Sequence, residues 1–459
     1  MKRFWALLIA VLTLVCCMSC GDGKGEKKEN VTYALRVDSA VKSYWLGDSF
    51  EEPSMVTLIE MKDGRPGQRI LEKSEYEVDS SAYDSTKEGS YEIVVTYAEK
   101  NATVKYTVNV KKASALSMTI EGQRLRFYEG DDFETGKISV TVALEDGTVK
   151  TLETTQYEVD FSAYKKDEVG SYPIVVRSED FDAEERYTVY VRDTDLPEYG
   201  TKISILGIGN SYSQDAMNHL YTILRGYGFE TITLANLMKS NGSLEDHANG
   251  IKTGAAIYEF ELNVAGAWKT DPENKSLEYG LSFTEWDAVI LQQRSGLAGL
   301  PATYGEDFEY LSSYVANRTA DKATRIYWQL PWTYETDSTH ADFKNYGNNQ
   351  ISMYNAIVST VQQQVATSVN IDGILPVGTA VQNIRSLLTT DKITRDGFHL
   401  NLFYGRYLAG AVWAAGIVGG DPSSLALSGN SAIDQYVPEI RLSVAAAMQN
   451  PFKITDLRA

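Results

Sequence analysis

The chain has 459 residues, of which 43% are hydrophobic and 23% are charged, a composition typical of folded proteins. At about 150 residues per domain, this length predicts about three domains. Its 62 acidic and 43 basic residues give a net charge of −19, which argues against binding nucleic acid or anionic lipid through basic patches. With four histidines and no His-Glu-x-x-His motif, the chain has few possible ligands for a multi-histidine metal site, and we expect no metal. We also expect no cofactor.

The first 30 residues have the pattern of an export signal. Lys2 and Arg3 precede the apolar run 4–15, which is too short for a confident membrane span. Ser19 and Cys20 then resemble a bacterial lipobox, in which Cys20 is acylated. This predicts a signal peptide over 1–19, a lipoprotein tether over 20–30, and a surface-exposed location in the bacterial envelope. An ordinary secretory signal is the alternative.

The next 160 residues contain an internal duplication. Tyr76–Asp79 recurs as Tyr157–Asp160, and Gly89–Tyr91 recurs as Gly170–Tyr172, each 81 residues further on. A period of this length indicates tandem domains rather than a solenoid.

Each repeat has the pattern of an all-β sandwich. Runs such as Tyr91–Tyr97 and Val104–Val110 are rich in β-branched and aromatic residues, and turn signals separate them. The repeats resemble bacterial immunoglobulin-like modules, which we expect at 31–112 and 113–193, with a linker over 194–201. Such modules act as spacers or bind glycans, and both readings stay open.

From Lys202 onward, strands and helices are expected to alternate. The expected strands are Ile203–Gly209, Thr231–Leu237, Trp286–Gln293, Thr324–Leu330 and Gly373–Gly378, and the expected helices include Phe308–Ala316, Ser352–Ser368 and Leu402–Val418. Alternation of this kind predicts a parallel sheet covered on both faces. A site would lie beyond the carboxyl ends of its strands.

Two sequence segments carry candidate chemistry. Ser211 follows the first expected strand, where a helix N-terminus favours a developing oxyanion. Asp396 and His399 stand three residues apart, so the carboxylate could orient the imidazole as a base for a serine nucleophile. The structural alternatives are a serine helix cap, an aspartate cap and a surface histidine.

The order of these segments resembles the SGNH (GDSL-like) hydrolase superfamily, over a little more than half the chain. The resemblance implies a three-layer α/β/α domain over 202–459, with Ser211 as nucleophile and Asp396 and His399 as acid and base. It further implies that the backbone amides of Ser211 and Gly242 face the oxyanion.

Two departures from that family's pattern are visible. Asn210 stands where aspartate is most common, and Leu291–Ser295 replaces the usual Gly-x-Asn-Asp. A glutamine amide could replace the missing asparagine as an oxyanion donor, and strand alternation favours Gln293 over Gln292. Alternatively, the glutamine pair only satisfies backbone groups.

Three aromatic residues flank the end of the fourth expected strand. Trp328, Trp332 and Tyr334 could stack on a sugar ring or belong to the core. The combined pattern resembles a subgroup known mainly as a domain of unknown function.

The sequence thus predicts two tandem immunoglobulin-like sandwiches followed by an SGNH-type domain with a parallel sheet. The expected function is a serine esterase that removes O-acyl groups, chiefly acetyl, from polysaccharide or oligosaccharide, with membrane contact through the lipid anchor only. The alternatives are a non-catalytic glycan-binding lipoprotein with an inactive hydrolase fold, and a lipase or thioesterase.

Overall fold

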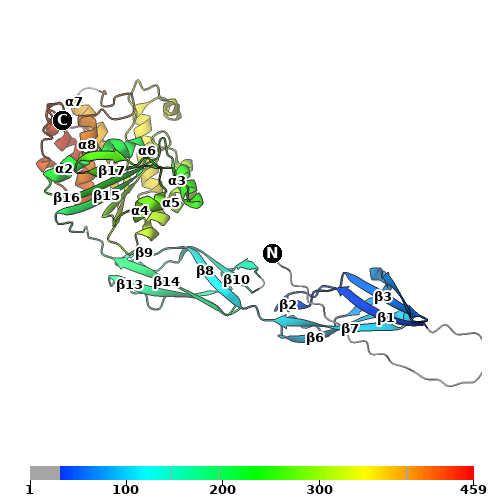
Figure 1. Cartoon of the computed structure of the whole chain (residues 1–459). Helices are drawn as coiled ribbons and strands as arrows, with labels where there is room; N and C mark the ends of the chain where they lie inside the picture. Colours follow the sequence, from blue (N-terminus) through cyan, green and yellow to red (C-terminus); the bar gives the residue numbers. More distant parts are fainter. Residues whose placement is uncertain (1–30, 146, 196, 389–390, 459) are drawn as a thin grey trace, which may run out of the picture. The chain divides into compact units, whose positions relative to one another are not determined.

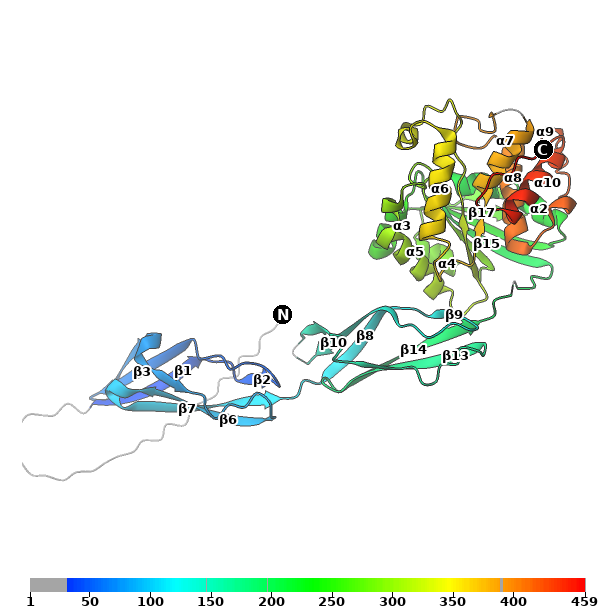
Figure 2. The same ribbon diagram turned by 180° about the vertical axis from the view of Figure 1, so that it is seen from behind.

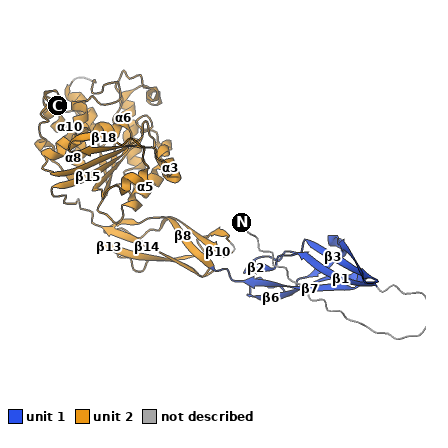
Figure 3. Ribbon diagram, in the orientation of Figure 1, with its two compact units in different colours: residues 1–114 blue, residues 115–459 orange. Residues whose placement is uncertain are grey.

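The computed structural model describes residues 31–145, 147–195, 197–388 and 391–458. The expected signal peptide, the tether and Cys20 lie outside these residues. The chain divides into two compact units, residues 1–114 and 115–459 (Figure 3). Within the described residues, no helix is long and apolar enough to cross a membrane.

The described part of the first unit is a β-sandwich. Its strands are β1 (Val31–Ser39), β2 (Ser43–Trp45), β3 (Met55–Lys62), β4 (Arg65–Ile70), β5 (Glu77–Asp79), β6 (Gly89–Tyr97) and β7 (Ala102–Lys111). One sheet has the order β1-β3-β4 and the other β2-β7-β6-β5. Leu35 and Val56 from the first sheet are buried against Val95 from the second, because alternate strand residues point into the shared core.

The second unit begins with a sandwich of the same topology. Its strands are β8 (Ala115–Gln123), β9 (Arg126–Tyr128), β10 (Gly136–Leu144), β11 (Val149–Thr151), β12 (Glu158–Asp160), β13 (Gly170–Ser178) and β14 (Ala183–Arg192). Its sheets run β8-β10-β11 and β9-β14-β13-β12. The Tyr83 hydroxyl donates to the Asp48 carbonyl at 2.8 Å, and Tyr164 repeats this bond to Asp131 at the same distance.

The rest of the second unit is an α/β domain. Its strands are β15 (Lys202–Gly209), β16 (Thr231–Met238), β17 (Glu259–Val264), β18 (Ala267–Thr270), β19 (Ala288–Leu291), β20 (Arg325–Gln329) and β21 (Gly373–Leu375). Its helices are α1 (Ser211–Met217), α2 (Leu220–Gly226), α3 (Leu244–Thr253), α4 (Leu277–Ser282), α5 (Gly305–Arg318), α6 (Gln350–Gln364), α7 (Val377–Leu388), α8 (Tyr404–Val418), α9 (Ser431–Asp434) and α10 (Val437–Gln449).

Helices cover both faces of this sheet, as Figures 1 and 2 show from opposite sides. The strand order is β18-β17-β16-β15-β19-β20-β21, in which the last five are parallel. One apolar cluster joins the sheet to α1, α2, α7, α8 and α10, and a second joins it to α3, α4, α5 and α6. The predicted fold class, two sandwiches and a three-layer α/β/α domain, is confirmed.

The sheet differs from the prediction at two places. The antiparallel hairpin β17–β18 was not predicted; Ala265 and Gly266, both with positive φ, form its two-residue turn. The expected strand Gly373–Gly378 ends at Leu375, and α7 begins at Val377. Pro376 explains this switch, because proline lacks the N–H that a strand donates and suits a helix start.

Within the second unit, the sandwich contacts the α/β domain through buried polar groups. The Arg126 guanidinium lies 3.1 Å from the Asp372 carboxylate, with side chains 1% and 5% exposed. The Asn317 side chain accepts from the Leu125 N–H at 3.1 Å and donates to the Gln123 carbonyl at 2.8 Å. These bonds lie at the start of β21 and the end of α5, at the amino-terminal side of the parallel strands.

Candidate active site

Ser211 is the first residue of α1, directly after β15. Asn210 is the N-cap of this helix, and its side-chain oxygen accepts the Tyr212 N–H at 3.0 Å. The Ser211 N–H lies in the first turn, so the helix itself supplies no acceptor for it. The Ser211 Oγ lies 2.8 Å from the Nε2 of His399.

Asp396 completes a hydrogen-bonded series with these two residues. Its Oδ2 lies 2.7 Å from the Nδ1 of His399, and its Oδ1 accepts the His399 backbone N–H at 2.8 Å. Burial acts to raise the pKa of Asp396, but the hydrogen bonds from His399 and the backbone lower it overall. An ionised Asp396 therefore fixes Nδ1 as a proton donor and leaves Nε2 facing the serine hydroxyl.

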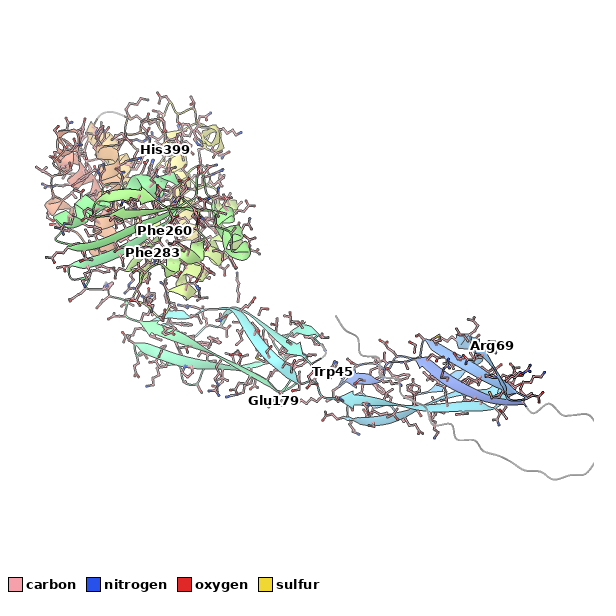
Figure 4. The ribbon with its side chains drawn as sticks, viewed as in Figure 1. Trp45, Arg69, Glu179, Phe260, Phe283 and His399 are labelled. Carbon is pink, nitrogen blue, oxygen red and sulfur yellow. The ribbon has the colours of Figure 1, made fainter. Side chains whose placement is uncertain are left out.

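The base and the acid lie on a loop before α8, at the carboxyl ends of the parallel strands. Figure 4 shows His399 toward one end of the α/β domain and Phe283 toward the other. The His399 side chain is 19% exposed and that of Asp396 is 40% exposed, so solvent reaches the site.

Two buried carboxylates hold this loop. Glu335 is 3% exposed and accepts from the backbone N–H and the hydroxyl of Thr394 at 2.9 and 2.7 Å. Asp215 is fully buried and accepts from Arg395 and from the Leu400 N–H. We did not identify either residue from the sequence. The only local signal was the position of Asp215, one helical turn after Ser211.

A chain of buried amides lies beneath the nucleophile. The Trp413 indole donates to Gln329 at 2.8 Å, Gln329 donates to Gln292, and Gln292 donates to the Asn210 Oδ1 at 2.6 Å. Asn210 in turn donates through Nδ2 to the Gly242 carbonyl at 3.0 Å. The departure from aspartate at position 210 thus has a physical reason: an ionised aspartate has no hydrogen to give to that carbonyl.

The structure does not turn Gln293 toward an oxyanion. Its Nε2 donates to the carbonyl and hydroxyl of Thr303 at 3.0 and 3.2 Å, and its Oε1 accepts the Leu244 N–H at the start of α3. The Gly242 N–H is also used, because it donates to the Lys239 carbonyl at 2.8 Å in a tight turn. Of the expected oxyanion groups, only the Ser211 N–H keeps a free position.

The three aromatic residues expected to bind sugar are core residues. Trp328, Trp332 and Tyr334 are each 0% exposed. Trp328 packs under α5, and Trp332 stacks on Tyr212 with ring centroids 3.8 Å apart. The expectation of sugar stacking at these residues is therefore wrong, since a fully buried ring has no free face.

The other three histidines stay outside the triad. His219 contacts the Leu402 carbonyl at 3.0 Å, and His247 is buried and stacked on Tyr258. His340 lies near the site, because its ring contacts Phe398, the neighbour of His399, with centroids 4.7 Å apart. Among the residues that the structure describes, no cluster of three or more His, Cys, Asp or Glu side chains could hold a metal ion.

The comparisons with known proteins agree with this fold. The family "Domain of unknown function (DUF4886)" matches residues 204–428, and "Bacterial Ig-like domain (group 3)" matches residues 39–110. The search of curated proteins finds no match.

Solved structures also resemble the α/β domain. A DUF4886 family protein from Bacteroides uniformis is 31% identical with a TM-score of 0.53, over 56% of this chain and 98% of that one. An acetylxylan esterase from Geobacillus stearothermophilus is 10% identical with a TM-score of 0.31, over 49% of this chain and 97% of that one. The match to nearly the whole Bacteroides protein at this identity shows that the chain belongs to the DUF4886 family, with a bacterial Ig-like domain before the family's domain.

Proposed function

We propose that this protein is an exported serine ester hydrolase that removes O-acyl groups, chiefly acetyl, from carbohydrate. The observation that carries the proposal is the unbroken series from the Ser211 Oγ through His399 to Asp396, with bonds of 2.8 and 2.7 Å. These are the roles that nucleophilic acyl transfer needs: a nucleophile, a base and a group that orients the base.

The mechanism follows from these positions. His399 takes the Ser211 hydroxyl proton through Nε2 as the Oγ bonds to the ester carbonyl carbon. The carbonyl oxygen becomes an oxyanion, and the Ser211 N–H and the positive end of the α1 dipole stabilise it. His399 then gives the proton to the departing sugar oxygen, which leaves an acyl-serine. Water, deprotonated by His399, then attacks the acyl carbon. The bond from this carbon to Oγ breaks, the acid leaves, and His399 returns the proton to the Ser211 Oγ.

The test is acetate release from p-nitrophenyl acetate and from acetylated xylan. Ser211→Ala should abolish turnover of both substrates, and an organophosphate should modify Ser211 in the parent protein. Ser359→Ala is the matched control, because this exposed α6 serine has a hydroxyl that accepts only from Gln363. If the parent releases no acid from acetyl or longer acyl esters and resists the organophosphate, the esterase proposal fails.

A glycan-binding protein without turnover is the second candidate function. Two groups that could donate to an oxyanion, the Gln293 amide and the Gly242 N–H, are used inside the protein. This candidate predicts glycan binding by the parent with no acid released and no serine modified. A lipase or thioesterase would instead show turnover that rises with acyl chain length.

We further propose the location predicted from the N-terminus: the surface of the bacterial envelope, anchored through an acylated Cys20. In the chain, the two sandwiches would then lie between the anchor and the α/β domain. Metabolic labelling with a radioactive fatty acid tests this, because Cys20→Ser should abolish the label. Label that persists in Cys20→Ser would contradict acylation at this residue.

A further inference from the structure

A pocket of about 230 Å³ lies beside α1, between this helix, the β16–β18 edge of the sheet and the start of α8. Gln214 lines it from α1 and Asn218 from the C-cap that follows this helix, Glu261 and Trp268 line it from the hairpin, and Arg406 from α8. A single buried water needs only about 10–15 Å³, so the pocket has room for a ring-sized ligand.

The polar atoms in this pocket are fixed and only partly used. Glu261 is 8% exposed, and its carboxylate accepts from the Gln214 amide and from the Asn236 amide, the latter at 2.9 Å. A carboxylate offers about four acceptor positions, so Glu261 keeps capacity for a ligand. The Arg406 Nε and one Nη bind Asp215 at 2.8 and 2.7 Å, which leaves its other Nη for the pocket.

The charges around the pocket balance. Glu261 and Asp215 carry two negative charges, and Arg406 and Arg395 carry two positive ones, with Asp215 bound to both arginines. An anionic ligand would meet Arg406, whose charge is already paired with Asp215. Glu261 accepts from two neutral amides and keeps acceptor positions, so a neutral ligand with many hydroxyl groups could use both these acceptors and the remaining Arg406 donor. The Trp268 ring adds an apolar wall, as sites for small polar ligands commonly require.

Two helices link the lining of the pocket to the catalytic residues. Gln214 lies one helical turn after Ser211 on α1, and Arg406 lies seven residues after His399. We infer that this pocket binds a neutral sugar ring of the acylated substrate while Ser211 attacks the ester; this inference rests on the proposed esterase function.

The test compares sugar acetates with an ester that has no sugar. The substrates are β-D-xylose tetraacetate, glucose pentaacetate and p-nitrophenyl acetate, assayed with the full chain. Asn218→Phe should fill the pocket and raise KM for the sugar acetates about tenfold or more. Asn218→Ala should raise it about 3- to 10-fold, the loss expected for one hydrogen bond. Both variants should keep kcat/KM for p-nitrophenyl acetate within about twofold of the parent. This change is smaller than the effect expected for the sugar acetates.

Asn218 suits this test because its φ of −55° and ψ of −45° are open to any residue. Asn249→Phe and Asn249→Ala are matched controls on an exposed position of α3. They should leave KM and kcat/KM unchanged for the sugar acetates and for p-nitrophenyl acetate.

The outcomes separate the two proposals. An active parent whose KM for sugar acetates is unchanged by Asn218→Phe would overturn the sugar pocket and leave the esterase standing. Equal losses on all three substrates would also overturn it, because they indicate damage to the catalytic residues. A parent inactive on all three substrates would overturn the esterase function itself.

Discussion

Asp215 accepts the backbone N–H of Leu400 at 2.9 Å, and thereby ties the residue after His399 to the helix that begins with Ser211. The same carboxylate lies 3.1 Å from Arg395 and 2.7 Å from Arg406. Arg395 also closes the loop itself, since its backbone N–H donates to the His399 carbonyl at 2.8 Å. One buried side chain therefore links the loop that carries the base to the helix that carries the nucleophile.

We expect Asp215→Asn to lower both stability and turnover. Two guanidinium groups lose their buried counter-charge, and removing one partner of a buried pair costs about 3–5 kcal/mol of unfolding free energy. A shift of about 1 Å in the His399 loop would lower kcat about 100-fold, with less effect on KM. Urea unfolding and steady-state kinetics below the transition measure the two effects.

Asp307→Asn is the control for that change. Asp307 is partly exposed and has one 4.0 Å pair with Lys252, so its loss should cost less than about 1 kcal/mol. Equal stability of the parent and Asp215→Asn would contradict the anchoring role.

We expect Asn210→Asp to reduce turnover. The new carboxylate can still accept from Tyr212 and Gln292, but it faces the Gly242 carbonyl without a hydrogen to donate. An unmatched buried acceptor costs about 1–3 kcal/mol, so kcat/KM for p-nitrophenyl acetate should fall about tenfold and the melting temperature should drop. Asn355→Asp, at an exposed position of α6, should leave both unchanged. Full activity of Asn210→Asp would show that the amide hydrogen is dispensable.

His247 should make stability depend on pH. Burial lowers its pKa from 6.5 to about 4, so the folded state holds it neutral while the unfolded chain takes up a proton. Its contribution is complete above pH 6.5 and is lost progressively as the pH falls to about 4, by about 3 kcal/mol in total. His247→Phe should flatten the stability profile across this range in urea titrations. If the parent and His247→Phe lost stability equally over this pH range, His247 would not be the source of the pH dependence.

The buried pair Arg126–Asp372 should couple the second sandwich to the α/β domain. Arg126→Ala leaves Asp372, at 5% exposure, with only the more distant Arg325 at 3.8 Å as a counter-charge. We therefore expect a loss of about 3 kcal/mol, at the lower end of the range for breaking a buried pair. Lys137→Ala breaks an exposed pair with Glu309 in the same unit and should cost less than about 1 kcal/mol. Calorimetry of residues 31–459 compares the unfolding transitions of the two variants. Equal unfolding temperatures for both variants would argue against coupling between the second sandwich and the α/β domain.

Local patterns in the sequence were sufficient for most of the fold. The 81-residue repeat predicted two similar sandwiches, and β6 and β13 begin 81 residues apart at Gly89 and Gly170. The alternation of expected strands and helices predicted the three layers. The strands could be recognised because strands buried on both faces of a parallel sheet form long apolar runs. The hairpin β17–β18 escaped prediction since its turn, Ala265-Gly266, lacks an asparagine or aspartate signal.

The sequence by itself determined which residues could form a triad, because Ser211, Asp396 and His399 have the required chemistry and follow or precede expected elements. Only the tertiary structure decided what surrounds them. The glutamine amides found partners far along the chain, with Gln329 bound to Gln292 and to Trp413, so strand alternation could not assign their direction. Likewise, whether Trp332 faces solvent or Tyr212 depends on how the layers pack, which no local pattern records.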